Sequence, residues 1–413
     1  MAWQFSIGNL VQRAVTAPAA VSPAVSDTLL PLTNLATGYP DQEASFEWRS
    51  DGHYKVDIDL NVLRATSSRT DAPSGWRDYL LYLAGTPGLG SNAPDWGSYG
   101  SRTALRLYKP MFQEIEVLPG EDWKLSMSIY EPTASTATGI QVRVIDTWSG
   151  LGWNGSAWAD GGILDSQSTE DTWKEIAEEI TADPNRSVRS TYLVVVEPIA
   201  ATYSATTYVY ASANGGSGSP ALYGKVDFIA LIGHNIPSEA TVSCDGFSFS
   251  TIDPITATKS DTATFDQVWR LDIQMPAGNQ PRPKIGELWM GRLQTFTRGP
   301  DPGIDINEGD INQIRVSAAG GRQEVLSDMR IPARSIGMKV RTFTDAAFTQ
   351  YRDQLTRGTR FGAEPLLLVP PLELEGIALP VHGRVGPVTG YKNAEAGWRE
   401  FTVNLMESPF SGS

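Results

Sequence analysis

The chain has few of the residues from which catalytic and metal sites are usually built. Its 413 residues include one cysteine, Cys244, and three histidines. A single cysteine excludes a disulfide within the chain, and there is no CxxC pair or Cys/His cluster with zinc-site spacing. The sequence therefore predicts no cofactor and no bound metal, and it favours assembly in a reducing compartment.

Sequence motifs of common enzyme classes are also absent. The chain contains no Walker A sequence, no GxGxxG following a strand, no GxSxG and no HExxH. We therefore expect a protein that is not an enzyme.

Long apolar runs and excess positive charge are missing as well. No stretch of 18 apolar residues occurs, so we expect no membrane span. The first 25 residues have no compact apolar core, which argues against a secretory signal. With 47 acidic and 33 basic residues, the formal charge of -14 opposes binding to nucleic acid.

Short alternating apolar runs, separated by 39 glycines and 27 prolines, dominate the rest of the sequence. Apolar residues alternate in four segments, 54–62, 123–130, 139–145 and 399–406, as in half-buried antiparallel strands. The predicted fold class is mainly β, a multidomain β-sandwich and jelly-roll protein with one short helix near 345–357.

Two segments have helical spacing. In 344–358, Thr344 or Asp345 can cap a helix that ends at Gly358. In 169–180, Trp173, Ile176 and Ile180 fit a helix, but a strand with a turn fits that segment almost as well.

Loop-rich stretches suggest the domain boundaries. They predict an N-terminal arm at 1–26, a discontinuous sandwich from 27–66 and 223–297, an inserted module at 67–222 and a C-terminal β-rich assembly domain at 298–413.

The layout of the discontinuous part resembles the discoidin-like (F5/8 type C-like) β-sandwich of tail and virion structural proteins of tailed bacteriophages. The resemblance lies in Asn34-Leu35, then Trp48-Arg49, and after the interruption Gly233-His234-Asn235. The segment PKIGELWMGR at 283–292 is similar to the strand that closes such domains.

The inserted part resembles a carbohydrate-binding-module jelly roll, from EVLPGEDWKLSMSIYEP at 116–132 to the segments STYLVVVEP and TTYVYAS. The C-terminal part, with its PLLLVP segment at 365–370, resembles a domain of phage tail-tip proteins.

One aromatic cluster in the inserted module is a candidate glycan-binding site. Trp148, Trp153 and Trp158, with Asn154, can hold a sugar ring by stacking and hydrogen bonding. The alternative is that these tryptophans anchor a glycine-rich hairpin to the core.

His234 and Asn235 follow an apolar run, and no nucleophile or orienting acid is linked to them by a motif. We expect them to satisfy backbone groups at the end of a strand. Acidic residues at 301–310 lack EF-hand spacing, so we expect a solvated acidic loop there, although the sequence alone does not decide whether calcium binds.

The resemblances imply a structural component of a tailed-phage virion, in the tail, tail tip or baseplate. It would be assembled in the host cytoplasm as a homo-oligomeric ring and dock to other phage tail proteins, and its inserted module would contact a host-surface glycan. The alternative is a carbohydrate-binding adhesin or host-receptor-binding protein, and a polysaccharide-degrading enzyme has less support.

Overall fold

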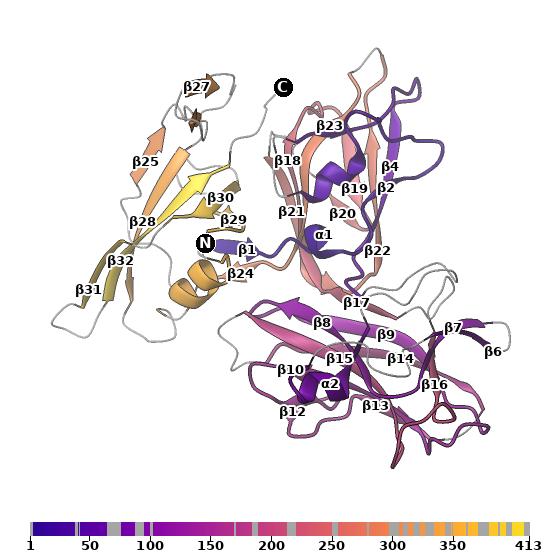
Figure 1. Ribbon diagram of the computed structural model, residues 1–413. Helices are drawn as coiled ribbons and strands as arrows, with labels where there is room; N and C mark the ends of the chain where they lie inside the picture. The colour runs from indigo at the N-terminus through magenta and orange to yellow at the C-terminus, as the bar shows by residue number, and fades with distance from the viewer. Residues whose placement is uncertain are drawn as a thin grey trace. The chain divides into compact units, whose positions relative to one another are not determined.

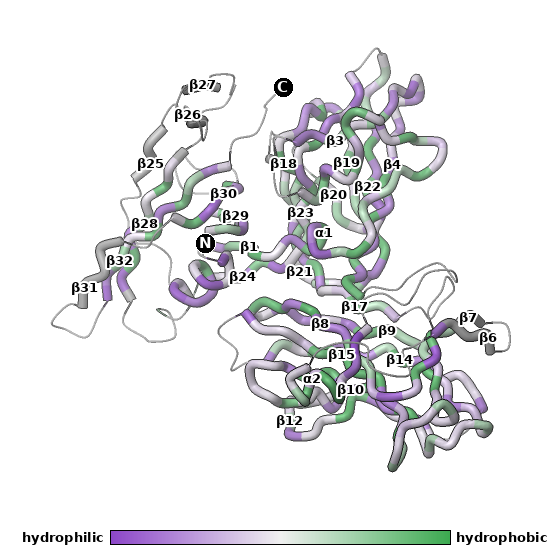
Figure 2. The backbone as a smooth tube through the Cα atoms, viewed as in Figure 1, coloured by the Kyte–Doolittle hydropathy of each residue, from purple (hydrophilic) through white to green (hydrophobic). Residues whose placement is uncertain are grey.

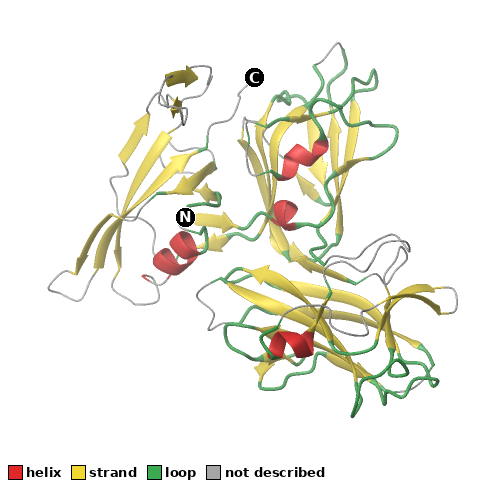
Figure 3. Cartoon of the chain, in the orientation of Figure 1, coloured by secondary structure: helices red, strands yellow, loops and turns green. Residues whose placement is uncertain are grey.

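The protein is mainly β, which confirms the predicted fold class (Figure 3). The computed structural model describes residues 3–37, 40, 42–63, 76–86, 95–99, 102–168, 171–183, 189–212, 220–249, 255–278, 281–296, 305–308, 313–316, 323–326, 334–342, 348, 350–360, 362–370, 380–386, 389–393 and 399–408. Hydrophobic and hydrophilic segments are interleaved along the described residues (Figure 2). None of the helices within those ranges is long and apolar enough to cross a membrane.

The chain divides into two compact units, and two segments of the second unit interrupt the sequence of the first. The first unit comprises Met1–Asp59, Val226–Thr264 and Val268–Ser413. The second comprises Leu60–Lys225 with Phe265–Gln267, and we call it the inserted module. The sequence had placed this module at 67–222.

Two antiparallel sheets form the inserted module (Figure 1). One contains β5 (Arg77–Asp78), β8 (Met111–Val117), β10 (Ile140–Asp146), β11 (Gly152–Trp153), β12 (Trp158–Ala159), β13 (Asp165–Gln167) and β15 (Ser190–Pro198). The other contains β6 (Asp95–Tyr99), β7 (Arg102–Leu107), β9 (Trp123–Tyr130), β14 (Trp173–Ile180), β16 (Val209–Ser212) and β17 (Ala221–Gly224). Helix α2 (Tyr79–Leu83) begins at Asp78, whose carboxylate accepts hydrogen bonds from the backbone of Leu80 and Leu81.

The alternation seen in the sequence produces the core of this module. In β9 the side chains of Trp123, Leu125, Met127 and Ile129 are fully buried, as the strand prediction for 123–130 requires. The helical alternative for 169–180 is wrong. Trp173–Ile180 is strand β14, because all eight of its residues pair with β9 and the sheet supplies the partners for its backbone.

In the first unit, two sheets form the discontinuous sandwich (Figure 1). The four-stranded sheet has the order β21 (Ile255–Thr264), β18 (Val226–His234), β23 (Lys284–Gly291) and β3 (Ala44–Ser45). The five-stranded sheet has the order β2 (Ala19–Ala20), β4 (His53–Asp59), β22 (Val268–Gln274), β19 (Thr241–Cys244) and β20 (Phe247–Ser248). Strand β4 pairs with β22 over its whole length, so segments on either side of the inserted module share one sheet.

An eight-stranded sheet, the C-terminal sheet, completes the first unit. It contains β1 (Gln4–Ile7), β24 (Gln294–Thr295), β25 (Asp305–Glu308), β28 (Arg334–Thr342), β29 (Leu366–Val369), β30 (Val381–Val385), β31 (Thr389–Asn393) and β32 (Arg399–Glu407). Strands β26 (Gln313–Val316) and β27 (Gln323–Leu326) pair in a separate two-stranded antiparallel sheet. Strand β1, from the predicted N-terminal arm, pairs with β29 and β24.

Short helices complete the fold. They are α1 (Leu10–Arg13), the 3-10 helix η1 (Leu32–Ala36) and the π-helix η2 (Gln350–Arg357). Helix η2 lies within the predicted helix near 345–357 and ends before Gly358. The predicted caps Thr344 and Asp345 lie outside the described residues, as do Asp301 and Asp310 of the acidic loop.

Candidate functional site

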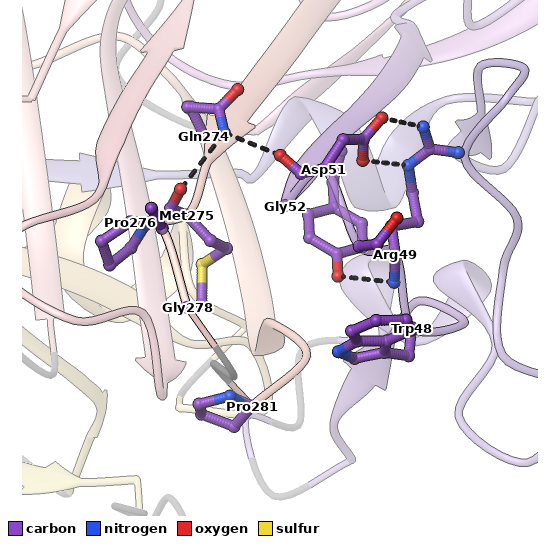
Figure 4. Close-up of a pocket in the computed structure, with 12 residues that line it drawn as sticks. Trp48, Arg49, Asp51, Gly52, Gln274, Met275, Pro276, Gly278 and Pro281 are labelled. Carbon is purple, nitrogen blue, oxygen red and sulfur yellow. Dashed lines mark hydrogen bonds and ion pairs between the residues drawn. The ribbon is translucent and has the colours of Figure 1, made fainter.

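A pocket of about 190 Å³ opens where β4 begins and β22 ends (Figure 4). The pairing of His53 with Gln274 and of Tyr54 with Ile273 fixes the two strand ends side by side. The pocket is lined by Trp48, Arg49, Ser50, Asp51, Gly52, Tyr54, Gln274, Met275, Pro276, Ala277, Gly278 and Pro281. Its volume is below the roughly 300–1,000 Å³ of pockets that enclose a drug-sized ligand, so it suits one ring or one chain end.

Charged and polar groups hold the turn on one side of the pocket in a single conformation. The Arg49 guanidinium binds the Asp51 carboxylate through two hydrogen bonds, with Nε 2.9 Å from Oδ1. Arg49 Nη1 also donates to the carbonyl of Pro23 at 2.6 Å. The hydrogen bond from Arg49, followed by one from the backbone N–H of His53, lowers the pKa of Asp51, so the carboxylate stays ionised near neutral pH.

The same turn depends on a glycine. Gly52 has φ of +63°, and a Cβ there would lie 3.2 Å from Cβ of Met275. Its carbonyl accepts from the N–H of Met275 at 2.8 Å, and Gln274 Nε2 donates to the carbonyl of Asp51 at 3.1 Å. The two sides of the pocket are therefore tied together by backbone contacts that a larger residue would disturb.

Trp48 gives the pocket an exposed aromatic surface. Its side chain is 57% exposed, whereas large aromatic side chains in the described core are almost entirely buried. Figure 4 shows Trp48 on one side of the pocket, with Met275, Pro276 and Pro281 on the other. An exposed indole beside a fixed carboxylate can stack on the apolar face of a ring while the carboxylate accepts from its hydroxyl groups.

The predicted aromatic cluster of the inserted module is only partly exposed. Trp153 is 5% exposed, and its indole N–H donates to the carbonyl of Glu179 at 3.0 Å. Trp158 is half-buried, donates to the carbonyl of Thr181 at 2.9 Å, and lies 5.5 Å from Trp153 between ring centres. These contacts anchor the β11–β12 hairpin to the end of β14 and to Thr181, the residue that follows it.

The other two predicted glycan-binding residues lie at turns. The side-chain oxygen of Asn154 accepts from the N–H groups of Ser156 and Ala157, so it caps the hairpin turn. Trp148 is 47% exposed, and its backbone N–H donates to Ser190 Oγ at 3.1 Å. Of the four predicted residues, Trp148 alone presents a largely open aromatic face.

His234 and Asn235 hydrogen bond to neighbouring strands and turns at the end of β18. His234 is 5% exposed; its Nε2 lies 3.0 Å from Thr256 Oγ1, and its Nδ1 accepts from the N–H of Ile236. Asn235 accepts from the N–H of Lys284 at 2.7 Å and donates to the carbonyl of Arg282 at 3.2 Å. The Asn235 contacts hold the end of β18 to the start of β23, and the His234 contact joins it to β21.

Residues typical of metal and nucleophilic sites do not gather in the part of the chain that the structure describes. No group of three His, Cys, Asp or Glu residues there is arranged to hold a metal ion. Cys244 is fully buried, and burial raises the pKa of its thiol far above the usual range. Such a thiol is a small core residue rather than a nucleophile.

The sequence offered one signal for the pocket. Trp48 and Arg49 belong to the WRSDG segment, in which a tryptophan directly precedes a polar turn. Gln274, Met275 and Pro281 lie more than 200 residues further on, and only the β4–β22 pairing brings them to the same place.

Comparison with known proteins adds little to this geometry. No protein-family model and no curated protein sequence matches the chain. Among solved structures, it is similar to the N-terminal CBM22-1-CBM22-2 tandem domain of Xyn10C from Paenibacillus barcinonensis, with 10% sequence identity. The likeness covers 56% of this chain and 97% of that one at a TM-score of 0.24, which is too low to assign a fold family or a function.

Proposed function

We propose that this protein is a non-catalytic carbohydrate-binding protein, such as an adhesin or host-receptor-binding protein, and that the Trp48 pocket is its binding site. The observation that carries the proposal is the Trp48 side chain, 57% exposed at a small pocket whose polar groups are already fixed. Preorganised groups lose little entropy on binding, which is what a weakly held, hydrated ligand such as a sugar requires.

The polar groups of the pocket retain some hydrogen-bonding capacity. The contacts to Asp51 and Pro23 use three of the five N–H donors of Arg49. The Asp51 carboxylate has about four acceptor sites, and Arg49 and the N–H of His53 occupy three of them. A sugar hydroxyl can therefore accept from Arg49 and donate to Asp51.

The same groups argue against hydrolysis at this pocket. Glycoside hydrolysis ordinarily requires two carboxyl groups, one of them protonated at working pH. Among the residues that line the pocket in the described chain, Asp51 is the one carboxylate, and its lowered pKa keeps it ionised. A binding role fits this arrangement better than an enzymatic one.

A glycan array tests the proposal. We expect the full-length protein to bind a defined set of glycans and Trp48→Ala to weaken that binding about five- to thirtyfold, because stacking and burial on an indole contribute on the order of 1–2 kcal/mol. Trp148→Ala is the matched control, since Trp148 is an exposed tryptophan outside the pocket. Equal binding by wild type and Trp48→Ala would exclude the pocket, and loss with Trp148→Ala alone would place the site in the inserted module.

A second candidate function is assembly into the tail of a phage particle. It is supported by the layout of the sequence and by β21, a ten-residue strand at the edge of the four-stranded sheet, which pairs with β18 on one side and with no strand among the described residues on the other. In this role the protein would form a ring in the virion tail, and the pocket would meet the host surface. Electron microscopy of the purified protein should show closed rings, and a monodisperse monomer at micromolar concentration would argue against assembly without partners.

A further inference from the structure

A carboxyl group and an imidazole face each other between two layers of the first unit. Glu287 belongs to β23 of the discontinuous sandwich, and His382 belongs to β30 of the C-terminal sheet. Both side chains are fully buried. Ionisable groups are rarely buried to this degree without a partner that balances their charge.

The atoms through which Glu287 and His382 face each other lack aligned hydrogen bonds in the described part of the chain. Glu287 Oε1 accepts from Asn9 Nδ2 at 2.9 Å and from Gln12 Nε2 at 2.7 Å, both on or beside α1. Glu287 Oε2 lies 3.3 Å from His382 Nε2. Within the described part of the chain, no aligned hydrogen bond reaches Glu287 Oε2 or either ring nitrogen of His382.

The number of protons on the Glu287–His382 pair decides whether a net charge is buried. With one proton between Oε2 and Nε2, the pair is neutral overall and each of these atoms gains a partner. With no proton, two lone pairs face each other and a net negative charge is buried. With two protons, a net positive charge is buried. Both charged states carry a large desolvation cost.

We propose that Glu287 and His382 share a single proton and form a latch between β23 and β30, which opens when that proton is lost and also when a second one is added. The pair sits beside apolar contacts between the same layers. Trp289 of β23 packs edge-on against the His382 ring at 5.8 Å, and Leu367 of β29 lies in one cluster with Trp289, Phe228, Ala230 and Ile232. One neutral hydrogen bond, from Trp289 Nε1 to Ser6 Oγ of β1 at 3.0 Å, also joins these layers. A charge forming at the pair would therefore weaken an interface that is otherwise held by apolar and neutral contacts.

One neighbouring charge, Arg384 on β30, lowers the pKa of both residues, so it opposes the effect of burial at Glu287 and adds to it at His382. Helix α1 presents amide groups to Glu287 and carries Arg13 in its last turn, and Glu407 on β32 lies opposite Gly383 in the ladder. Burial raises the pKa of Glu287 to about 7, and burial followed by Arg384 lowers the pKa of His382 to about 3.

These directions give the latch two pH limits. Glu287 has a raised pKa, so its contribution is complete below its ordinary value of 4.5 and is lost as pH rises through about 7. His382 has a lowered pKa, so its contribution is complete above its ordinary value of 6.5 and is lost as pH falls toward about 3. The two effects oppose each other between 4.5 and 6.5, so the latch should be insensitive to pH there and weaken on either side.

Hydrogen exchange of the full-length protein tests the latch. We expect protection factors of β30 backbone amides to be constant from pH 4.5 to 6.5. Outside that range they should fall by up to tenfold per pH unit, the change for one proton, until the protonation of the folded pair is complete. Strand β15 of the inserted module is the internal reference and should not follow this profile.

Two variants distinguish the acid limit of the latch from its alkaline limit. Glu287→Gln cannot ionise, so it should abolish the loss of protection above pH 6.5 and keep the acid-side loss, which would then begin near pH 6.5. His382→Gln cannot take up a proton, so it should abolish the acid-side loss and keep the loss on raising pH, which would then begin near pH 4.5. If one variant does not fold, the other still tests one limit by itself.

Histidine-labelled NMR gives an independent measurement, because the chain has three histidines and His382→Gln identifies the relevant signal. The His382 ring signals should stay constant between pH 4.5 and 6.5. A full titration inside that window, or β30 protection that is the same in wild type and both variants from pH 3 to 8, would overturn the latch.

Discussion

At the scale of single residues, exposure separates the tryptophans of this protein into two roles. Trp153 is 5% exposed and bonded to a backbone carbonyl, whereas Trp48 is 57% exposed beside the pocket. A buried indole stabilises the fold, and an exposed one contributes little to it and is free to contact a ligand. The sequence shows tryptophans flanked by polar and glycine residues in both places and does not distinguish them.

The two roles should give different losses in the free energy of unfolding when each tryptophan is replaced by alanine. We expect Trp153→Ala to lower the free energy of unfolding by about 3–5 kcal/mol, because it leaves a large cavity and an unpaired carbonyl. Trp48→Ala should change it by less than about 0.5 kcal/mol. Urea denaturation of both variants provides the comparison. A large loss with Trp48→Ala would mean that reduced glycan binding by this variant cannot be attributed to the pocket.

At the scale of elements, the sequence predicts most strands correctly. It fails to predict the conformation of a segment that becomes a strand only by pairing with a distant one. Val56 and Ile58 alternate with polar residues, and both are buried in β4 as expected. Strand β14 has residues at helical spacing, and its conformation is decided by β9, which lies more than 40 residues earlier. Tertiary pairing overrides local propensity there.

The site was less predictable than the strands for the same physical reason. The Trp48 pocket joins residues near position 50 to residues near 275, and the latch joins Glu287 to His382. Neither pairing leaves a pattern in the local sequence, because the first arises from the pairing of β4 with β22 and the second from the packing of two different sheets. The predicted cluster at 148–158 is contiguous in the sequence, and there the structure shows hairpin-anchoring contacts at Trp153 and Trp158.

The close contacts at Gly358, directly after helix η2, provide a test at the scale of elements. A Cβ at Gly358 would lie 2.0 Å from the carbonyl oxygen of Gln354 and 2.9 Å from Cδ1 of Ile7. We expect Gly358→Ala to destabilise the first unit by about 3 kcal/mol, since the contact is with backbone and cannot be relieved by a side-chain rotation. Gly386→Ala is the control, because its Cβ would meet Asn404 at an ordinary 3.4 Å. Thermal denaturation should show a lower midpoint for Gly358→Ala, and equal midpoints would contradict the close contact.

At the scale of the whole molecule, the chain leaves the first unit at Asp59 and returns to it at Val226. All the strands of the two inserted-module sheets lie between these points. The fully buried side chains of these sheets include Trp123, Leu125 and Val194. An insertion of this kind is compatible with independent folding of the inserted part.

We therefore expect a fragment of residues 60–225 to fold by itself. It would lose the short segment Phe265–Gln267, and with it the hydrogen bond from the N–H of Leu60 to the carbonyl of Gln267 at 2.8 Å and the packing of Lys225 on Phe265. Each contact contributes on the order of 1 kcal/mol, which is small beside the roughly 5–15 kcal/mol of a stable domain. The fragment should show a cooperative urea transition and a β-type circular dichroism spectrum, while a fragment of 76–198, which lacks β16 and β17, should not. A 60–225 fragment that stays unfolded would mean that the core of the inserted module depends on the first unit, although its sheets contain no strand from that unit within the described residues.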